Sequence, residues 1–371
     1  MQKKKILIFP FDLLSHYLRC ITLAESYKDY EILFAFSEKY DPFIKKAGFN
    51  SFKVESFDPV EVMKCAAEFN FSWLNCNSIE SVLQSQIKVI NDLKPYFVIG
   101  DTSPTLKMAA EFTKVKYIAL MNGYMSKYYS NVRALSITHS GHKHLSKLPE
   151  NISNPITTFA ENIAFKIVHK PFRKIRRKYG LSKITNYLNE MEGDENLLCD
   201  EPWLFPQNKL PANYKVIGPL LYASTENEKE FLSTLNPLKP TICVCLGSSG
   251  NWNALQFLSE KKYNLFNLVV AGDLNKILQG EHIYHKEFVN LNEILPQCFF
   301  MICHGGNGTI YEGIKHKIFM LCLTSHFEQE WNVQQISKLN LGIMINNSPS
   351  KYIDKKMEEV LLGGNKKAVV Y

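Results

Sequence analysis

Short apolar runs alternate with amphipathic stretches along the whole chain. Uninterrupted runs rich in β-branched and aromatic residues are typical of strands buried on both faces of a parallel sheet. Between them, segments such as residues 78–95 place apolar residues at helical spacing. The expected strands are residues 6–9, 32–36, 97–99 and 117–120 in the first half, and 241–246, 268–271, 299–303 and 318–323 in the second. The pattern predicts an α/β protein with a doubly wound parallel sheet in each half.

The length of 371 residues, of which 46% are hydrophobic, indicates two globular domains rather than one core. Residues 219–239 mix proline, glycine and charged residues without periodicity, as linkers do. We therefore expect an N-terminal domain over residues 1–218, a linker over 219–239 and a C-terminal domain over 240–371.

Charge and cysteine content narrow the function classes. The net charge of +7 is modest for this length, and acidic residues are spread along most of the chain, so no nucleic-acid partner is expected. The nine cysteines form no Cys-x-x-Cys pair, which favours a reducing compartment. No apolar run approaches the roughly 18 residues that span a bilayer, and we expect a cytoplasmic protein.

The most distinctive motif is HGGNGT, residues 304–309, directly after an expected strand and before an expected helix. Gly305, Gly306 and Gly308 allow close backbone approach, and free N–H groups at a helix start attract anions. The motif matches neither Gly-x-Gly-x-x-Gly nor a Walker loop. It predicts a phosphate site, the alternative being a tight turn without a ligand.

Further polar residues follow at positions where strand ends meet. In a doubly wound sheet, loops beyond the carboxyl ends of neighbouring strands converge on one crevice. We therefore expect one site lined by His304, Thr309, Glu312, Glu328 and Gln329. A ligand with a diphosphate, a ribose and a sugar suits this set.

With these residues the chain resembles the inverting nucleotide-sugar glycosyltransferases of the UDP-glucosyl and macrolide glycosyltransferase type, across residues 288–332. The resemblance implies the GT-B fold, with two Rossmann-like domains facing across a cleft, and a UDP- or dTDP-sugar bound by the C-terminal domain. Diphosphate binding is implied for Ser248 or Ser249, His304, Gly305, Gly306, Asn307, Gly308 and Thr309. It further implies that Phe288 stacks on the base, that Glu312 holds the ribose, and that Glu328 and Gln329 hold the sugar. Asn332 matches an asparagine shortly after that pair.

The resemblance places the catalytic base at His16, after the first strand, and its carboxylate partner at Asp101. Histidine suits this role because its unperturbed pKa lies close to working pH. Ser15 and Arg19 replace a glycine and a proline that are usual in the family. The alternatives are a structural histidine and an aspartate that caps the following helix.

The implied reaction is a single inverting displacement without a cofactor. No Asp-x-Asp motif of the kind used by metal-dependent sugar transferases occurs, and we expect no metal. The acceptor is expected to be a hydroxyl-bearing small molecule.

Three competing hypotheses stay open at this stage. The basic run from Lys166 to Lys178 is usual for a solvated helix face, but it also suits peripheral membrane contact and a lipid-linked acceptor. A nucleotide-sugar 2-epimerase shares the same fold. A donor-binding protein without catalysis is the non-enzymatic alternative.

Overall fold

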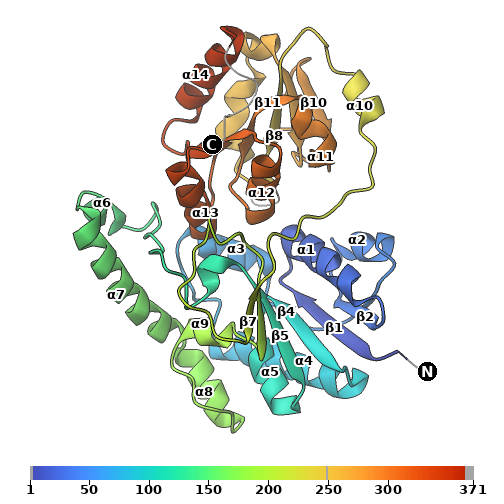
Figure 1. Ribbon diagram of the computed structural model, residues 1–371, viewed down its shortest axis with the longest axis vertical. Coiled ribbons are helices and arrows are strands. Elements are labelled where there is room, and N and C mark those ends of the chain that lie inside the picture. The colour runs from blue at the N-terminus through green and yellow to red at the C-terminus, as the bar shows by residue number, and fades with distance from the viewer. Residues whose placement is uncertain (1–2, 248–249, 364–371) are drawn as a thin grey trace. The chain divides into compact units, whose positions relative to one another are not determined.

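The computed structural model describes residues 3–247 and 250–363. These form two compact units, Met1–Tyr222 and Ala223–Tyr371, each built around its own parallel sheet (Figure 1). The boundary falls inside the segment 219–239 that was predicted as the linker.

Unit 1 contains a seven-stranded sheet with the order β3-β2-β1-β4-β5-β6-β7. Its strands are β1 (Lys5–Pro10), β2 (Glu31–Ala35), β3 (Asn50–Phe52), β4 (Phe97–Asp101), β5 (Lys116–Met121), β6 (Glu195–Leu198) and β7 (Tyr214–Val216). All of its neighbouring strands pair in parallel. Successive strands are added toward one edge of the sheet up to β3 and toward the other edge from β4 on, so the strand order changes direction between β1 and β4. Doubly wound sheets bind their ligands beside this point.

Unit 2 contains a six-stranded parallel sheet with the order β10-β9-β8-β11-β12-β13. Its strands are β8 (Thr241–Cys245), β9 (Asn267–Ala271), β10 (Ile283–Lys286), β11 (Cys298–Cys303), β12 (Phe319–Cys322) and β13 (Gly342–Met344). In this sheet the strand order changes direction between β8 and β11. The predicted fold class is confirmed in both halves.

Helices connect the strands. In unit 1 they are α1 (Leu14–Ala24), α2 (Asp41–Lys46), α3 (Pro59–Ala67), α4 (Cys76–Leu93), α5 (Leu106–Thr113), α6 (His142–Leu145), α7 (Glu150–Val168), α8 (Lys170–Lys178) and α9 (Tyr187–Glu190). In unit 2 they are α10 (Lys229–Ser233), α11 (Leu291–Ile294), α12 (Asn307–Lys315), α13 (Phe327–Lys338) and α14 (Pro349–Leu361). Short 3-10 helices are η1 (Glu25–Tyr27), η2 (Gly123–Met125), η4 (Trp252–Ser259), η5 (Lys261–Leu265) and η6 (Leu295–Gln297).

The central strands are buried on both faces because helices cover each side of the sheet. In β1, Leu7 and Phe9 belong to one core cluster, with residues of α4 and α5, while Ile6 and Ile8 belong to another, with residues of α1. This explains the unbroken apolar runs in the sequence. Among the described residues, no helix is both long enough and apolar enough to cross a membrane.

Candidate active site

His16 and Asp101 meet at the carboxyl edge of the sheet in unit 1. Strands β1 and β4 pair so that Pro10 lies opposite Asp101, and α1 begins four residues after β1 ends. His16 Nδ1 lies 2.9 Å from Asp101 Oδ1, and the two side chains are 12% and 0% exposed. When Nδ1–H donates to the carboxylate, Nε2 is left as the nitrogen that accepts a proton. The alternative role of Asp101 as a helix cap is excluded, since α5 begins after Thr105.

Arg19 completes this cluster, a role that the sequence analysis missed. Its Nε and Nη2 donate to both carboxylate oxygens of Asp101, and its Nη1 donates to Asn122 Oδ1. The whole guanidinium is buried. The spacing of three residues between His16 and Arg19, which puts both side chains on one face of α1, was the available signal.

The arginine determines the charge of the aspartate. Burial by itself raises the pKa of Asp101, but the charge of Arg19, followed by that of His16, outweighs burial and holds the pKa well below its usual range. Burial likewise lowers the pKa of Arg19, and the charge of Asp101 outweighs it and raises the pKa. Asp101 and Arg19 are therefore a buried ion pair, and Arg19 Nη2 also approaches His16 Nδ1 at 3.3 Å.

In unit 2, the glycine motif follows β11 and packs beside the turn after β8. These strands are neighbours, with Cys303 opposite Cys245, so both turns lie at the same sheet edge. The imidazole of His304 lies against both turns. A Cβ on Gly247 would lie 2.8 Å from His304 Cε1, and a Cβ on Gly306 would overlap His304 Nε2. Glycine is needed at both positions because the ring occupies the space of a side chain.

The environment of His304 keeps its ring neutral. Burial lowers the pKa of His304 to about 4, and the backbone of Cys245 opposes this only in part. The Nδ1 atom is buried and has no hydrogen-bond partner among the described residues. A buried polar atom without a partner is unfavourable by about 1–3 kcal/mol, a cost that a bound ligand offering a hydrogen bond would offset.

Helix α12 begins at Asn307, three residues after His304, and Gly306 is its N-cap residue. The first hydrogen bond of the helix runs from Ile310 N to Gly306 O, so the N–H groups of Gly308 and Thr309 have no acceptor within the helix. Apart from its chain neighbours and the backbone of α12, no atom of the described residues lies within 4 Å of the place where a Cβ on Gly308 would stand. The helix start therefore combines donor groups without acceptors in the helix with open space at the Cβ position of Gly308, a combination that suits an anion.

Glu312 is the buried acid of α12. Its Oε2 has no hydrogen-bond partner among the described residues, and basic side chains approach it through His316 Nε2 at 3.7 Å and Lys315 Nζ at 3.9 Å. Burial raises the pKa of Glu312, opposed by Lys315.

Residues of α13 support the turn. Gly305 has a φ of +80°, which favours glycine, and it packs against Val333 of α13. Asn332 Nδ2 donates to Gly305 O at 3.0 Å, which makes Asn332 a support of the motif. Gln329 is buried, and its Oε1 accepts from Ser325 N at 2.7 Å. Glu328 lies in the first turn of the same helix and is half-buried.

Four further residues were predicted to contact the donor, namely Phe288, Ser248, Ser249 and Asn307. Phe288 is half-buried and lies between β10 and α11, at the carboxyl edge of the sheet. Ser248 and Ser249 fall outside the described residues. Asn307 begins α12 together with the glycine motif.

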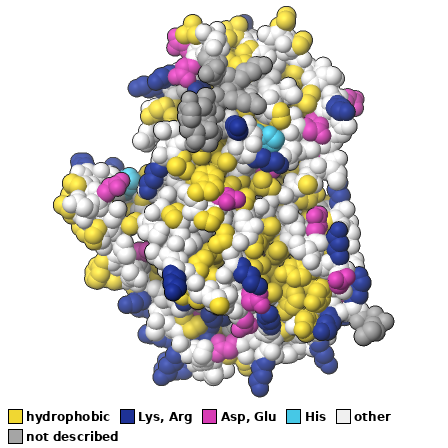
Figure 2. Space-filling view, viewed as in Figure 1, with side chains coloured by type: hydrophobic (Ala, Val, Ile, Leu, Met, Phe, Trp, Pro, Cys, Tyr) yellow, Lys and Arg dark blue, Asp and Glu magenta, His cyan; other side chains and the backbone are white. Residues whose placement is uncertain are grey.

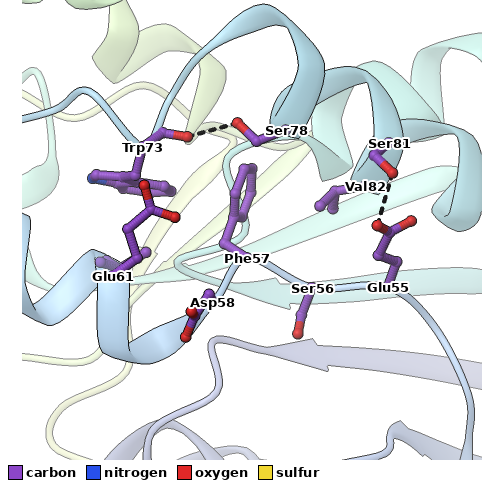
Figure 3. Close-up of a pocket in the computed structure, with 10 residues that line it drawn as sticks. Glu55, Ser56, Phe57, Asp58, Glu61, Trp73, Ser78, Ser81 and Val82 are labelled. Carbon is purple, nitrogen blue, oxygen red and sulfur yellow. Dashed lines mark hydrogen bonds between the residues drawn. The ribbon is translucent and has the colours of Figure 1, made fainter.

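A small pocket in unit 1 is lined by none of the predicted site residues (Figure 3). It is lined by Glu55, Phe57, Asp58, Glu61 and Trp73, among others, and has a volume of about 90 Å³. Pockets for drug-sized ligands have about 300–1,000 Å³, so this one is too small to hold an acceptor. Ser81 Oγ donates to Glu55 Oε1 at 2.7 Å across it.

Relatives in sequence cover most of the chain. It is 23% identical over 357 residues to the PGL/p-HBAD biosynthesis glycosyltransferase of Mycobacterium tuberculosis, covering 90% of this chain and 78% of that one. It is 22% identical over 344 residues to the PGL/p-HBAD biosynthesis rhamnosyltransferase of Mycobacterium bovis, covering 90% and 74%. An inactive PGL/p-HBAD biosynthesis glycosyltransferase of M. bovis is 26% identical over 261 residues, 66% of each chain. No protein-family profile matches.

Solved structures share the fold. The spinosyn rhamnosyltransferase SpnG has a TM-score of 0.67 at 14% identity, with 98% of this chain and 92% of that chain covered. It has also been solved with thymidine diphosphate and with the spinosyn aglycone. The calicheamicin glycosyltransferase CalG4 has a TM-score of 0.64 at 15% identity, with 99% and 96% covered. Together with the sequence relatives, these structures confirm the resemblance to the GT-B glycosyltransferases.

Proposed function

We propose that this chain, a glycosyltransferase of the GT-B fold, transfers a sugar from a UDP- or dTDP-sugar to a hydroxyl-bearing acceptor with inversion. In this proposal unit 2 binds the donor and unit 1 supplies the base. No metal or cofactor takes part.

One observation carries the donor half of the proposal. Within the part of the chain that the structure describes, His304 presents a buried ring nitrogen without a hydrogen-bond partner beside the start of α12, and the Cβ position of Gly308 is open. A diphosphate placed there accepts hydrogen bonds from the backbone N–H groups and from the neutral ring. The positive end of the helix dipole offsets part of its charge. Glu312 offers a carboxylate about one turn further along α12. The hydroxyls of a ribose would supply the hydrogen bonds that its Oε2 lacks among the described residues.

The catalytic half rests on His16. Nε2 of His16 takes the proton of the acceptor hydroxyl, and the acceptor oxygen forms a bond to the anomeric carbon. The bond from that carbon to the diphosphate oxygen breaks on the opposite face, and the nucleotide diphosphate leaves with the electron pair. Asp101 orients the ring through Nδ1 and balances the positive charge that the ring gains, as in other acid–histidine pairs.

Ligand-induced stabilisation tests the donor site. UDP or dTDP at about 100 times its Kd should stabilise the folded chain by about 2.7 kcal/mol, and His304→Ala should abolish the shift. His282→Ala is the matched control, because this buried histidine bonds to Leu258 O in the same unit. Its loss should lower the melting temperature and leave the ligand shift intact. If no nucleotide stabilises the wild-type chain, the donor site is wrong.

Turnover of His16→Ala tests the catalytic half separately. With a saturating donor and a panel of hydroxylated acceptors, the variant should bind nucleotide normally and transfer no sugar. Turnover equal to the wild type would contradict a base at His16 and favour a reaction without an acceptor base, such as 2-epimerisation.

A further inference from the structure

Helix α7 carries an apolar stripe that unit 1 leaves exposed. Of its 19 residues only Phe165 is buried. Ile152, Ile156, Phe159, Ile163 and Ile167 follow one another at spacings of three and four residues, and they are between 44% and 70% exposed. At 3.6 residues per turn they span an arc of about 80° along a helix about 28 Å long. Figure 2 shows hydrophobic side chains on the lobe where Figure 1 places α6 and α7.

The surroundings of this stripe are basic at both ends. Lys143 and Lys147 precede α7, and Lys166, Lys170, Arg173, Lys174 and Arg177 lie at its end and along α8. All seven are exposed, and none has a carboxylate within 4 Å among the described residues. The only acids between residues 140 and 180 are Glu150 and Glu161. Glu161 is turned inward to Arg133, at 2.8 Å.

A buried ion network fixes the direction of the basic side chains. Arg176 donates to both oxygens of Glu190, and its Nη1 donates to Glu111 at 2.7 Å. His169, at the start of α8, lies 2.6 Å from the same Glu190. With Phe172 and Ile175 also buried, one face of α8 is anchored to the unit and the other holds its cations in solvent.

We propose that α7 and α8 form a docking surface for an anionic lipid membrane. The stripe inserts into the boundary between headgroups and acyl chains, and the flanking cations bind lipid phosphates, as in interfacial amphipathic helices. The basic residues at both ends of α7 argue against self-association through this helix. Whether two α7 helices pack in parallel or antiparallel, basic clusters would face each other. The helix lies on the membrane, since it fails the hydropathy that a spanning helix needs.

This inference does not depend on the proposed sugar transfer. Vesicle binding is measured without donor or acceptor, and His304→Ala should retain it while losing nucleotide binding. Combined with the proposed function, membrane docking means that the enzyme works at the membrane surface. An acceptor with a lipid portion is concentrated there.

Co-sedimentation of the full chain with vesicles tests the proposal. We expect binding to vesicles of phosphatidylcholine with phosphatidylglycerol, and much weaker binding to phosphatidylcholine alone or at high ionic strength. Phe159→Asp with Ile163→Asp should lower the partition coefficient at least about thirty-fold. Lys170→Glu with Lys174→Glu should lower it at least about twenty-fold. Leu274→Asp is the control, as this leucine is 69% exposed in unit 2, and it should bind as the wild type does.

Three results would overturn the proposal. The first is equal binding to neutral and anionic vesicles, and the second is wild-type binding by the Phe159 and Ile163 variant. The third is a large loss of folding stability in that variant, or the loss of a dimer seen by sedimentation velocity, because either means that protein covers the stripe. An unchanged melting temperature with lost vesicle binding supports it.

Discussion

Replacing Arg19 with methionine removes the cation of the buried pair while retaining most of its side-chain volume. Asp101 then keeps its charge, with His16 Nδ1 at 2.9 Å as the remaining titratable partner in the cluster. Breaking a buried ion pair by removing one partner destabilises a protein by about 3–5 kcal/mol. We expect a loss of that size in the free energy of unfolding at neutral pH, measured by urea denaturation with circular dichroism.

Two variants separate this effect from a general loss of charge. Lys88→Met breaks an exposed pair with Asp92, whose side chains are 77% and 57% exposed, and should change stability by less than about 1 kcal/mol. Arg19→Met combined with Asp101→Asn removes the uncompensated charge, so it should be more stable than the sum of the single changes by about 1–3 kcal/mol.

The pH dependence has a definite sign. The pKa of Asp101 is lower in the folded chain than in the unfolded chain. Asp101 therefore contributes to the free energy of unfolding at pH values above its unfolded pKa of about 3.9, and this contribution is lost as the pH falls toward its folded pKa. In Arg19→Met, protonation of Asp101 removes the unpaired charge, so the deficit against the wild type should shrink as pH falls. A deficit below about 1 kcal/mol at neutral pH, or a double variant no better than additive, would refute the ion-pair account.

Three further predictions concern unit 2. Gly308→Ala should stabilise the chain without ligand by about 0.5–1 kcal/mol and weaken the binding of UDP or dTDP measured by calorimetry. Gly306→Ala should instead destabilise the chain by about 1–3 kcal/mol, because its side chain displaces His304. Equal effects of the two variants would contradict the geometry. Glu312→Gln should raise the free energy of unfolding by about 1 kcal/mol, since the buried Oε2 of Glu312 has no hydrogen-bond partner in the described part of the chain. It should also weaken nucleotide binding about tenfold. Lower stability of this variant would argue against the assignment. Since burial lowers the pKa of His304 to about 4, stability should fall by up to about 2 kcal/mol from about pH 6.5 to about pH 5, and His304→Gln should flatten this profile.

The central strands were readable from the sequence and the outer ones were not. The eight predicted strands correspond to β1, β2, β4, β5, β8, β9, β11 and β12. The missed strands are β6 and the four at the sheet edges, β3, β7, β10 and β13, with three or four residues each. An edge strand has one neighbour and less burial, so it needs no apolar run.

The candidate site shows the same division. The pairing of His16 with Asp101 was implied by the resemblance to the glycosyltransferases, and both residues follow apolar runs that mark strand ends. Arg19 was noted only as a substitution, because its partner lies 82 residues away and a lone arginine is usually a surface residue. The stripe on α7 was not predicted either, since helical periodicity alone does not say whether an apolar face is covered.

The imidazole of His304 joins two loops that are more than fifty residues apart in sequence. The ring fills the space in front of both Gly247 and Gly306. The three positions should therefore change together during evolution. A homologue without this histidine no longer needs glycine at position 306. A homologue that keeps the histidine cannot carry a larger residue at 247 or 306. The prediction for homologous chains is covariation at 247, 304 and 306, with drift at Gly306 as the first sign of a donor site no longer under selection.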